Sequence, residues 1–196
     1  MPLNHEPLAI PDVILVHPRI AGDRRGFFMQ SYKLDEYAAA GISCTFVQDN
    51  LSHSRMGTLR GMHWQRVQTQ DKLVQVVKGA VFDVAVDVRR GSPTFGQWVS
   101  AELSEENRAQ LFVPKGFAHG FRVLSEEADF YYKCSDFYAP GGEGGFRWDD
   151  PDVAIDWGKD FDRSAMLFSD KDMALPFLKD IPEALLPPFS APGEKL

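Results

Sequence analysis

The stretch LVQVVKGAVFDVAVDVRR, residues 73–90, decides the class of fold. It is rich in valine and is interrupted once, at Gly79, which divides it into two short runs. In the second run Val84, Val86 and Val88 alternate with more polar positions. This period of two predicts strands, the second with one apolar face and one more polar face.

Further strand-like segments lie on both sides of this stretch, with the turn sequences GDRRG, RRGSP, VPKG and APGGEGG between them. Only two segments favour helix, KLDEYAAAG at 33–41 and a stretch beginning near Ser169. Many short strands separated by turns predict a β-sandwich or closed barrel. The strand candidates are VILVHPR from Val13, TFVQDNLSHS from Thr45, GTLRGMHWQ from Gly57, FGQWVSAEL from Phe95, QLFVP from Gln110, GFRVL from Gly120 and DFYYKCS from Asp129.

The composition is that of an ordinary globular protein. The chain has 196 residues, 44% of them hydrophobic and 25% charged, which predicts a single domain over 1–196 with a Pro-rich extended tail from about residue 180. No apolar run reaches the roughly 18–20 residues that span a bilayer. The amino end lacks the pattern of a signal peptide. We therefore expect a cytoplasmic protein.

Charge and cysteine content exclude several classes of function. The net charge of -7 argues against general binding to nucleic acid or to a membrane surface, because both need a basic footprint. An anionic ligand would then need a local basic cluster. Cys44 and Cys134 form no CxxC motif, so we expect two free thiols rather than a disulfide framework or a structural zinc site.

Several common catalytic motifs are missing from the sequence. It has no GxGxxG, GxxxxGK[ST] or GxSxG, which argues against nucleotide binding by a Gly-rich loop and against esterase chemistry. It has no HxH or HExxH, and its five histidines are scattered singly. We therefore expect no catalytic metal site.

The segment LRGMHWQ, residues 59–65, is the first candidate for chemistry. Arg60 and His63 would lie on opposite faces of a regular strand. A bulge at Gly61 would bring both side chains to one face, and glycine is where bulges are expected. The alternative is an ordinary core or surface histidine on a strand.

Three other segments carry residues of similar chemistry. VPKGFAHGF places His119 between small residues that leave space for a ligand. DFYYKCSDFY predicts that Tyr132 points inward, either as a hydrogen-bonded core residue or as a proton donor beside an inward histidine. Ser169 and Asp172 resemble a helix capping box, and the same carboxylate could orient His63. Arg25, Arg60 and Lys72 are cations that would suit a phosphate if gathered around one cavity.

Together these segments resemble the dTDP-4-dehydrorhamnose 3,5-epimerases. The resemblance covers nearly the whole chain except the Pro-rich tail, and the combination of motifs is highly specific. It implies an all-β fold, a cupin-type jelly roll with a few short helices, in a homodimer without metal or organic cofactor. The matching segments are DRRGFF at 23–28, TFVQDNLSHS at 45–54, LRGMHWQ at 59–65, the stretch 71–98, LSEENRAQLFVPKGFAHGF at 103–121, YKCSDFYAPGGEGGFRWDDPD at 132–152 and SDKD at 169–172.

The resemblance also implies roles for individual residues. His63 resembles the general base, Asp172 its partner, and Tyr132 the acid on the opposite face of the sugar. Lys72 and His119 resemble groups near the sugar ring and its carbonyl oxygen. The positions that resemble contacts to the rest of the nucleotide sugar are Arg25, Gln30, Gln48, Asp49, Asn50, Arg60, Glu143 and Lys171, with Tyr138 stacking on thymine. Gln30 departs from the family, which commonly has Glu there, and this affects contacts to the base or to the partner chain.

The implied reaction is the epimerisation of dTDP-4-dehydro-6-deoxy-D-glucose at carbons 3 and 5, through an enolate. Three alternatives remain open at this point. One is an epimerase that acts at carbon 3 or carbon 5 only, on a related dTDP-4-keto-deoxysugar. The second is a cupin that binds a sugar nucleotide without turnover, and the third is a metal-dependent cupin dioxygenase or isomerase.

Overall fold

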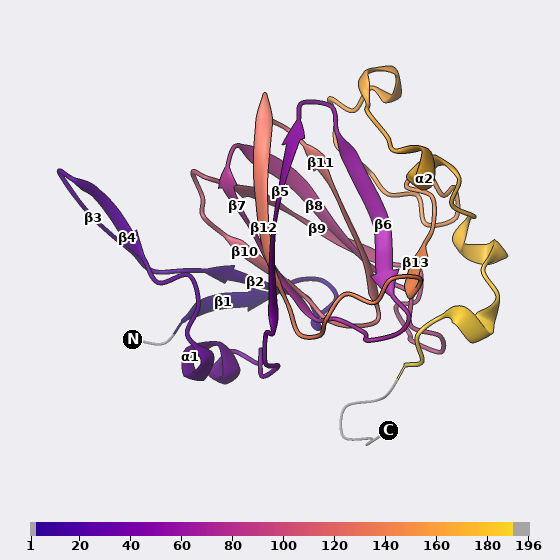
Figure 1. The fold of residues 1–196 in the computed structure, drawn as a ribbon, viewed down its shortest axis with the longest axis horizontal. Helices are drawn as coiled ribbons and strands as arrows, with labels where there is room; N and C mark the ends of the chain where they lie inside the picture. Colours follow the sequence, from indigo (N-terminus) through magenta and orange to yellow (C-terminus); the bar gives the residue numbers. More distant parts are fainter. Residues whose placement is uncertain (1–2, 190–196) are drawn as a thin grey trace.

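The computed structural model describes residues 3–189, and antiparallel sheets form most of it (Figure 1). A six-stranded sheet and a five-stranded sheet face each other, which confirms the predicted all-β architecture. The six-stranded sheet has the order β1 (Asn4–Pro7), β2 (Ile14–His17), β10 (Gln110–Val113), β7 (Lys72–Lys78), β12 (Glu127–Cys134) and β5 (Gln48–Arg55). The five-stranded sheet has the order β13 (Glu143–Gly145), β6 (Leu59–Gln65), β11 (Phe117–Val123), β8 (Ala80–Asp87) and β9 (Trp98–Ser104).

The remaining elements are short and lie outside the two sheets. A hairpin of β3 (Ile20–Asp23) and β4 (Gly26–Met29) projects away from the body of the molecule (Figure 1). The two predicted helices are present as α1 (Leu34–Ala39) and α2 (Asp170–Met173). Three 3₁₀ helices follow the sheets, η1 (Arg163–Ala165), η2 (Leu178–Asp180) and η3 (Glu183–Leu185).

The two-residue alternation in β8 sorts its side chains between the two faces of the five-stranded sheet. Val84 and Val86, with Val88 just after the strand, pack in a cluster with Trp148 and Trp157 from the later part of the chain. Each fully buried valine contributes about 1.5–3 kcal/mol relative to an exposed one. The more polar face of the strand is turned toward the other sheet, so the polar residues of β8 lie inside the molecule.

The space between the sheets is filled by apolar side chains over part of its length. Val74 and Phe130 from the six-stranded sheet meet Val81, Ala85 and Phe121 from the five-stranded sheet. The rings of Phe121 and Phe130 stack with centroids 4.3 Å apart. This packing holds the two sheets together and leaves the rest of the interior open to polar groups.

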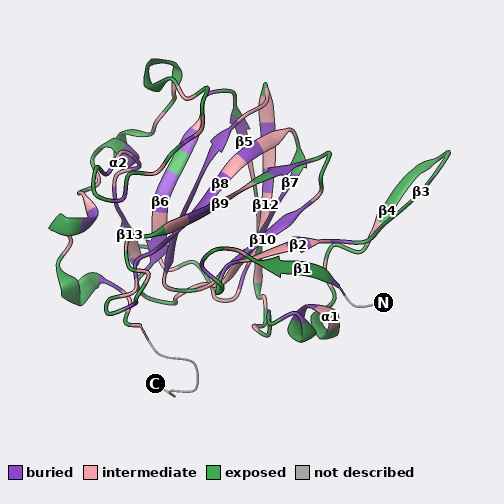
Figure 2. Ribbon diagram, turned by 180° about the vertical axis from the view of Figure 1, so that it is seen from behind, coloured by how far each residue is buried: buried purple, intermediate pink, exposed green. Residues whose placement is uncertain are grey.

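Four of the observed strands were not predicted from the sequence. All the residues of β3 and all but the last of β4 are exposed, so neither strand has an apolar face that would produce an alternating pattern (Figure 2). Strand β1 is likewise exposed throughout. Strand β13 has three residues, two of them glycine. These strands form through backbone pairing with neighbours, which leaves little trace in the sequence.

A bulge interrupts β6 at the position predicted. His63 pairs with His119 on β11, whereas Arg60 pairs with Phe121, so β6 has one residue more than β11 between these two pairs. Gly61 lies inside the bulge with φ of +127°. Arg60 and His63 consequently line the same cavity, as the bulge hypothesis requires.

The chain beyond residue 180 is only partly described. Residues 190–196 of the predicted extended tail lie outside the described residues. Before them, η3 is followed by a segment that runs beside Arg90, whose N–H donates to the Pro187 carbonyl at 2.7 Å. The Phe189 N–H donates in turn to the Arg90 carbonyl at 3.0 Å. Within residues 3–189, helices long and apolar enough to cross a membrane are absent, and both cysteines are unpaired.

Gly61→Ala should destabilise the fold, because an added Cβ would lie 2.6 Å from the Cα of Gly120 on the neighbouring strand. We expect a loss of about 2–3 kcal/mol in the free energy of unfolding, measured by urea denaturation. Gly26→Ala is the matched control, since its φ is +132° but no neighbouring heavy atom lies within 4 Å. Equal stability of the two variants would contradict a steric role for Gly61.

Candidate active site

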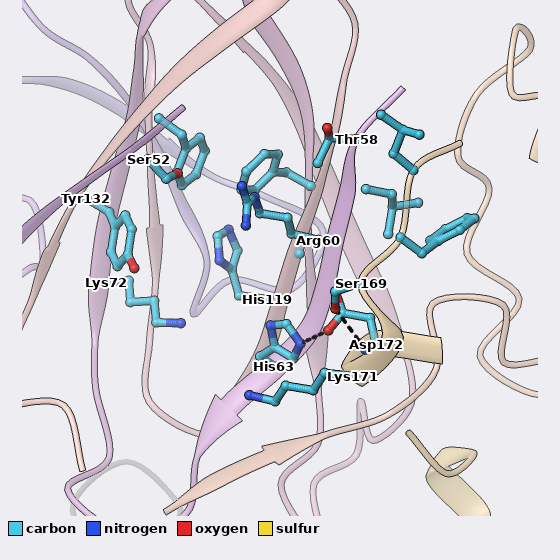
Figure 3. A pocket seen from close by; sticks show the side chains of 16 residues that line it. Ser52, Thr58, Arg60, His63, Lys72, His119, Tyr132, Ser169, Lys171 and Asp172 are labelled. Atoms are coloured by element: carbon cyan, nitrogen blue, oxygen red, sulfur yellow. Dashed lines mark hydrogen bonds and ion pairs between the residues drawn. The ribbon is translucent and has the colours of Figure 1, made fainter. Parts of the chain in front are cut away.

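A cavity of about 550 Å³ lies between the two sheets, and side chains from both of them line it (Figure 3). The segment from Leu167 to Asp172 runs past the start of β6 and forms part of the wall of this cavity. A second cavity of about 290 Å³ adjoins the first, and His63, Lys72 and Tyr132 line both. The predicted site residues that line the first are Arg60, His63, Lys72, His119, Tyr132, Lys171 and Asp172, and the second adds Gln48, Asn50, Tyr138 and Glu143.

His63 and Asp172 form a hydrogen-bonded pair, although 109 positions separate them in the sequence. The imidazole Nε2 lies 2.7 Å from the carboxylate Oδ1. Asp172 is buried, whereas about a third of the His63 side chain is exposed to the cavity. The carboxylate therefore holds one ring nitrogen and leaves the other side of the imidazole free for a ligand.

Asp172 is itself positioned by the start of helix α2. The Ser169 side chain caps this helix, with its Oγ accepting a hydrogen bond from the Asp172 N–H at 3.0 Å. The capping interaction predicted from the sequence thus places the carboxylate against the imidazole. Burial raises the pKa of Asp172, but the hydrogen bond and charge of His63 outweigh it and leave the pKa below its ordinary value.

Tyr132 lies on the wall opposite His63. It belongs to β12 of the six-stranded sheet, while His63 belongs to β6 of the five-stranded sheet (Figure 3). Phe130 and Cys134 are buried on the same face, which agrees with the predicted inward direction of Tyr132. Burial raises the pKa of the phenol, so it is protonated at neutral pH and can donate.

Lys72 is the cation that lines both cavities. It begins β7. Its ammonium group makes no hydrogen bond or ion pair with any side chain in the described part of the chain. Burial lowers the pKa of Lys72, while the negative charges of Asp83 and Glu143 oppose that shift. An ammonium placed in this way is available to an electron-rich ligand atom.

His119 forms a second histidine–carboxylate pair, with Asp83 of β8. The imidazole Nε2 lies 2.9 Å and 3.0 Å from the two carboxylate oxygens, and both side chains are buried. His119 is the direct strand partner of His63, so the two pairs lie side by side on one wall. Asp83 was not predicted as a site residue. The sequence feature that could have identified Asp83 is a carboxylate in the middle of a valine-rich strand.

Two further cations complete the electrostatics of the cavity. The Arg60 guanidinium donates to the Ser54 Oγ at 3.1 Å and to the His53 carbonyl at 3.3 Å, which fixes its direction. Lys171 forms an ion pair with Glu143 at the edge of the site. The cavity therefore has the local basic cluster that an anionic ligand would need in a chain of net charge -7.

Three predicted binding residues lie away from this cavity in the same chain. Arg25 is at the tip of the β3–β4 hairpin, where its guanidinium pairs with Asp23 and its side chain is 84% exposed. Gln30 follows the hairpin and is also exposed. Asp49 points to the other face of β5 from Gln48, because successive side chains of a strand alternate. There the Lys133 ammonium donates a hydrogen bond to the Asp49 carboxylate.

The described residues 3–189 contain no group of three or more His, Cys, Asp or Glu side chains that could hold a metal ion. Action without a metal stays a prediction. The polar groups that the structure does bring together are an imidazole with a carboxylate, a facing phenol and several cations. Such a set is suited to removing a proton on one side of a ligand and supplying one on the other.

Comparison with known proteins identifies the family. A sequence model described as dTDP-4-dehydrorhamnose 3,5-epimerase matches residues 7–180. The chain is 56% identical over 166 residues to the dTDP-4-dehydrorhamnose 3,5-epimerase of Pseudomonas aeruginosa, covering 84% of this chain and 90% of that protein.

Solved structures agree with the sequence comparison. The dTDP-6-deoxy-D-glucose-3,5-epimerase of Legionella pneumophila, in complex with dTDP-4-keto-L-rhamnose, has a TM-score of 0.92 and 49% identity, covering 96% of this chain and all of that one. A 3'-monoepimerase from Streptomyces bikiniensis in complex with dTDP-quinovose has a TM-score of 0.86 and 33% identity, covering 93% of this chain and 92% of that one. The fold is thus the predicted cupin-type jelly roll, and the chain belongs to the dTDP-4-dehydrorhamnose 3,5-epimerase family.

Proposed function

We propose that this protein epimerises dTDP-4-dehydro-6-deoxy-D-glucose at carbons 3 and 5, giving dTDP-4-dehydro-L-rhamnose. The observation that carries this proposal is the His63–Asp172 pair on one wall of a cavity and Tyr132 on the opposite wall. Family membership and the ligand of the Legionella structure support the same substrate class.

The chemistry of a 4-keto sugar explains why a base and an acid must face each other. The carbonyl acidifies the hydrogens on the two flanking carbons. His63 takes one of these protons, and Asp172 stabilises the imidazolium that forms. If the same group returned the proton, the configuration would be retained. Tyr132 delivers a proton from the opposite face, and the carbon is inverted.

The intermediate is an enolate, whose negative charge develops on the carbonyl oxygen. Lys72 and His119 are the groups we assign to that oxygen, because both line the cavity beside His63. Cationic or hydrogen-bond-donating groups fixed where charge develops stabilise a transition state strongly inside a partly dehydrated site.

The remote part of the ligand supplies binding energy that holds the small sugar ring in place. We assign the diphosphate to the cations Arg60 and Lys171 and the thymine to Tyr138, which is 48% exposed beside the second cavity. Gln48 and Asn50 line that cavity and offer amide groups to the same part of the ligand.

The experiment that tests the reaction is product analysis. The purified protein is incubated with dTDP-4-dehydro-6-deoxy-D-glucose, and the sugar is analysed by NMR. Inversion at both carbons supports the proposal. Inversion at one carbon would instead make this a monoepimerase, a candidate supported by the similarity to the Streptomyces bikiniensis protein. Binding without any inversion would leave a sugar-nucleotide-binding cupin and would overturn the proposal.

His63→Ala should strongly reduce turnover while leaving dTDP binding close to that of the wild type, because the imidazole acts on the sugar and not on the nucleotide. We expect the rate of epimerisation to fall on the order of 10²–10⁴-fold. The measurements are kcat by NMR and Kd for dTDP by calorimetry. Unchanged kcat in a folded variant would remove His63 from the role of base.

Asp172→Asn should lower stability in a pH-dependent way. The folded-state pKa of Asp172 is depressed, so its ionised form stabilises the fold above the unfolded pKa of about 3.9. That stabilisation is lost as the pH falls through the folded-state pKa. Urea denaturation should therefore show that the wild type has a larger free energy of unfolding than D172N at pH 7. This difference should become smaller as the pH is lowered. When His63 is also replaced by Ala, the effect of Asp172→Asn on the free energy of unfolding should be much smaller. A difference between the wild type and D172N that does not depend on pH would contradict the pairing of His63 with Asp172.

The working unit that we propose is a homodimer in which each hairpin reaches the partner's site. Phe27 and Phe28 are 56% and 73% exposed, so two adjacent large apolar side chains lie on the surface of the hairpin. Arg25 and Gln30 lie away from the cavity of their own chain, although the family resemblance assigns them to ligand binding. A second copy would cover the apolar hairpin and receive these polar groups.

Complementation between two inactive variants tests this arrangement. Arg25→Ala leaves the cavity intact but alters the hairpin, whereas His63→Ala does the reverse. If the hairpin serves the partner, mixed dimers contain one site with both residues intact. Refolding an equal mixture should then restore activity to about a quarter of the sites, since half the dimers are mixed. Activity no higher than the average of the two variants would contradict the arrangement, as would a monomer by light scattering.

The compartment that we propose is the cytoplasm. Cys44 and Cys134 are both free thiols in the structure, and free thiols persist in a reducing compartment.

A further inference from the structure

The His119–Asp83 pair is a buried ionisable pair beside the cavity, and the proton transfers described above do not use it. Asp83 is fully buried, and both of its carboxylate oxygens lie within hydrogen-bond distance of the His119 Nε2. A carboxylate without access to water is costly unless a positive charge or several hydrogen bonds compensate it. Among the described residues, the His119 ring is the only side chain hydrogen-bonded to Asp83.

The geometry fixes which part of His119 faces a ligand. An ionised carboxylate can only accept, so Nε2 carries a proton and donates it to Asp83. No side chain in residues 3–189 hydrogen-bonds the second nitrogen, Nδ1, and His119 lines the cavity. A neutral ring would then offer Nδ1 as an acceptor, whereas a cationic ring would offer it as a donor. Only the donor form can stabilise negative charge on an oxygen.

We propose that Asp83 is a positioning residue, which holds His119 as an imidazolium with Nδ1–H directed at the oxygen where the enolate charge develops. This inference rests on the proposed function, because the enolate is its ligand. It separates the roles of the two histidine–carboxylate pairs, which lie next to each other on one sheet. His63 exchanges protons with carbon, while His119 keeps its protons and supplies charge.

The surroundings of His119 limit the rotation of its ring and act on the charge of Asp83. Burial raises the pKa of Asp83, and the charges of His119 and Lys72 oppose that shift. The ring of His119 also stacks on Phe130, with centroids 6.0 Å apart, which limits its rotation. The titratable or charged groups that line the cavity with His119 are Arg60 and His63 from β6, Lys72 from β7, Tyr132 from β12, and Lys171 and Asp172 from α2.

Asp83→Asn is the primary test, because the carboxamide keeps the shape of the side chain but removes its charge. An imidazolium at His119 would then be uncompensated, so the ring becomes neutral. We expect kcat to fall on the order of 10²–10³-fold, with little change in KM. The same substitution in a His119→Asn background should have no further effect on kcat, because Asp83 acts through His119. If the loss of kcat in the double variant equals the product of the losses in the two single variants, Asp83 does not act through His119 and the proposal is overturned.

Asp87→Asn is the matched control. Asp87 is on the same strand, on the same face and equally buried, but its carboxylate binds Arg89, Ser92 and Thr94 away from the cavity. This variant is expected to lose stability without the selective loss of kcat. A comparable fall in kcat in folded D87N would mean that the effect of D83N is merely structural.

A measurement on the unaltered protein keeps the proposal testable if D83N does not fold. Nitrogen-15 NMR of the histidine side chains distinguishes a cationic ring from either neutral tautomer. At pH 7 the wild-type protein should show both nitrogens of His119 protonated. A neutral His119 would overturn the proposal. If the wild type fails to epimerise the sugar, the proposed function and the enolate role both fall, while the spectrum still decides whether Asp83 holds a cation.

Discussion

The site depends on the bulge between Arg60 and His63. A regular strand would turn one of these two side chains away from the cavity, because side chains alternate. The extra residue in β6 brings both to the inner face, and Gly61 allows the tight approach to Gly120 that this requires. His63 can then meet Asp172, which the cap of helix α2 holds in place. One local irregularity thus joins parts of the chain that are far apart in sequence.

The second constraint is that charge inside the jelly roll must be compensated. The inner faces of two sheets normally form an apolar core, and the Phe121–Phe130 pair shows that part of the interior does so. In the rest of the interior, Asp172 and Asp83 each lie against an imidazole, and the Lys72 ammonium makes no hydrogen bond or ion pair with a side chain of residues 3–189. Compensated carboxylates position the imidazoles, while the uncompensated ammonium is left to interact with an anionic ligand.

Sequence patterns predicted those parts of the structure in which local chemistry and fold agree. The alternation in β8, the Ser169 cap and the inward Tyr132 follow from rules that act within a few residues. The strands of the β3–β4 hairpin could not be predicted, because both of their faces are exposed. Their sequences therefore lack the alternation of apolar and polar residues that marks a half-buried strand. The pairing of Asp83 with His119 was also missed, since it depends on which strand becomes the neighbour of β8. The role proposed for Arg25, which lies away from the cavity of its own chain, rests on the family resemblance.

We propose that a base and an acid act from opposite walls of one cavity. The most direct test is deuterium exchange by Tyr132→Phe in heavy water, with dTDP-4-dehydro-6-deoxy-D-glucose as the probe. His63 remains able to remove a proton and to return a deuteron to the same face. We therefore predict incorporation of deuterium without inversion, observed together by NMR and mass spectrometry. Inverted, deuterated product at the wild-type rate would show that the second proton does not come from Tyr132, and would contradict the account.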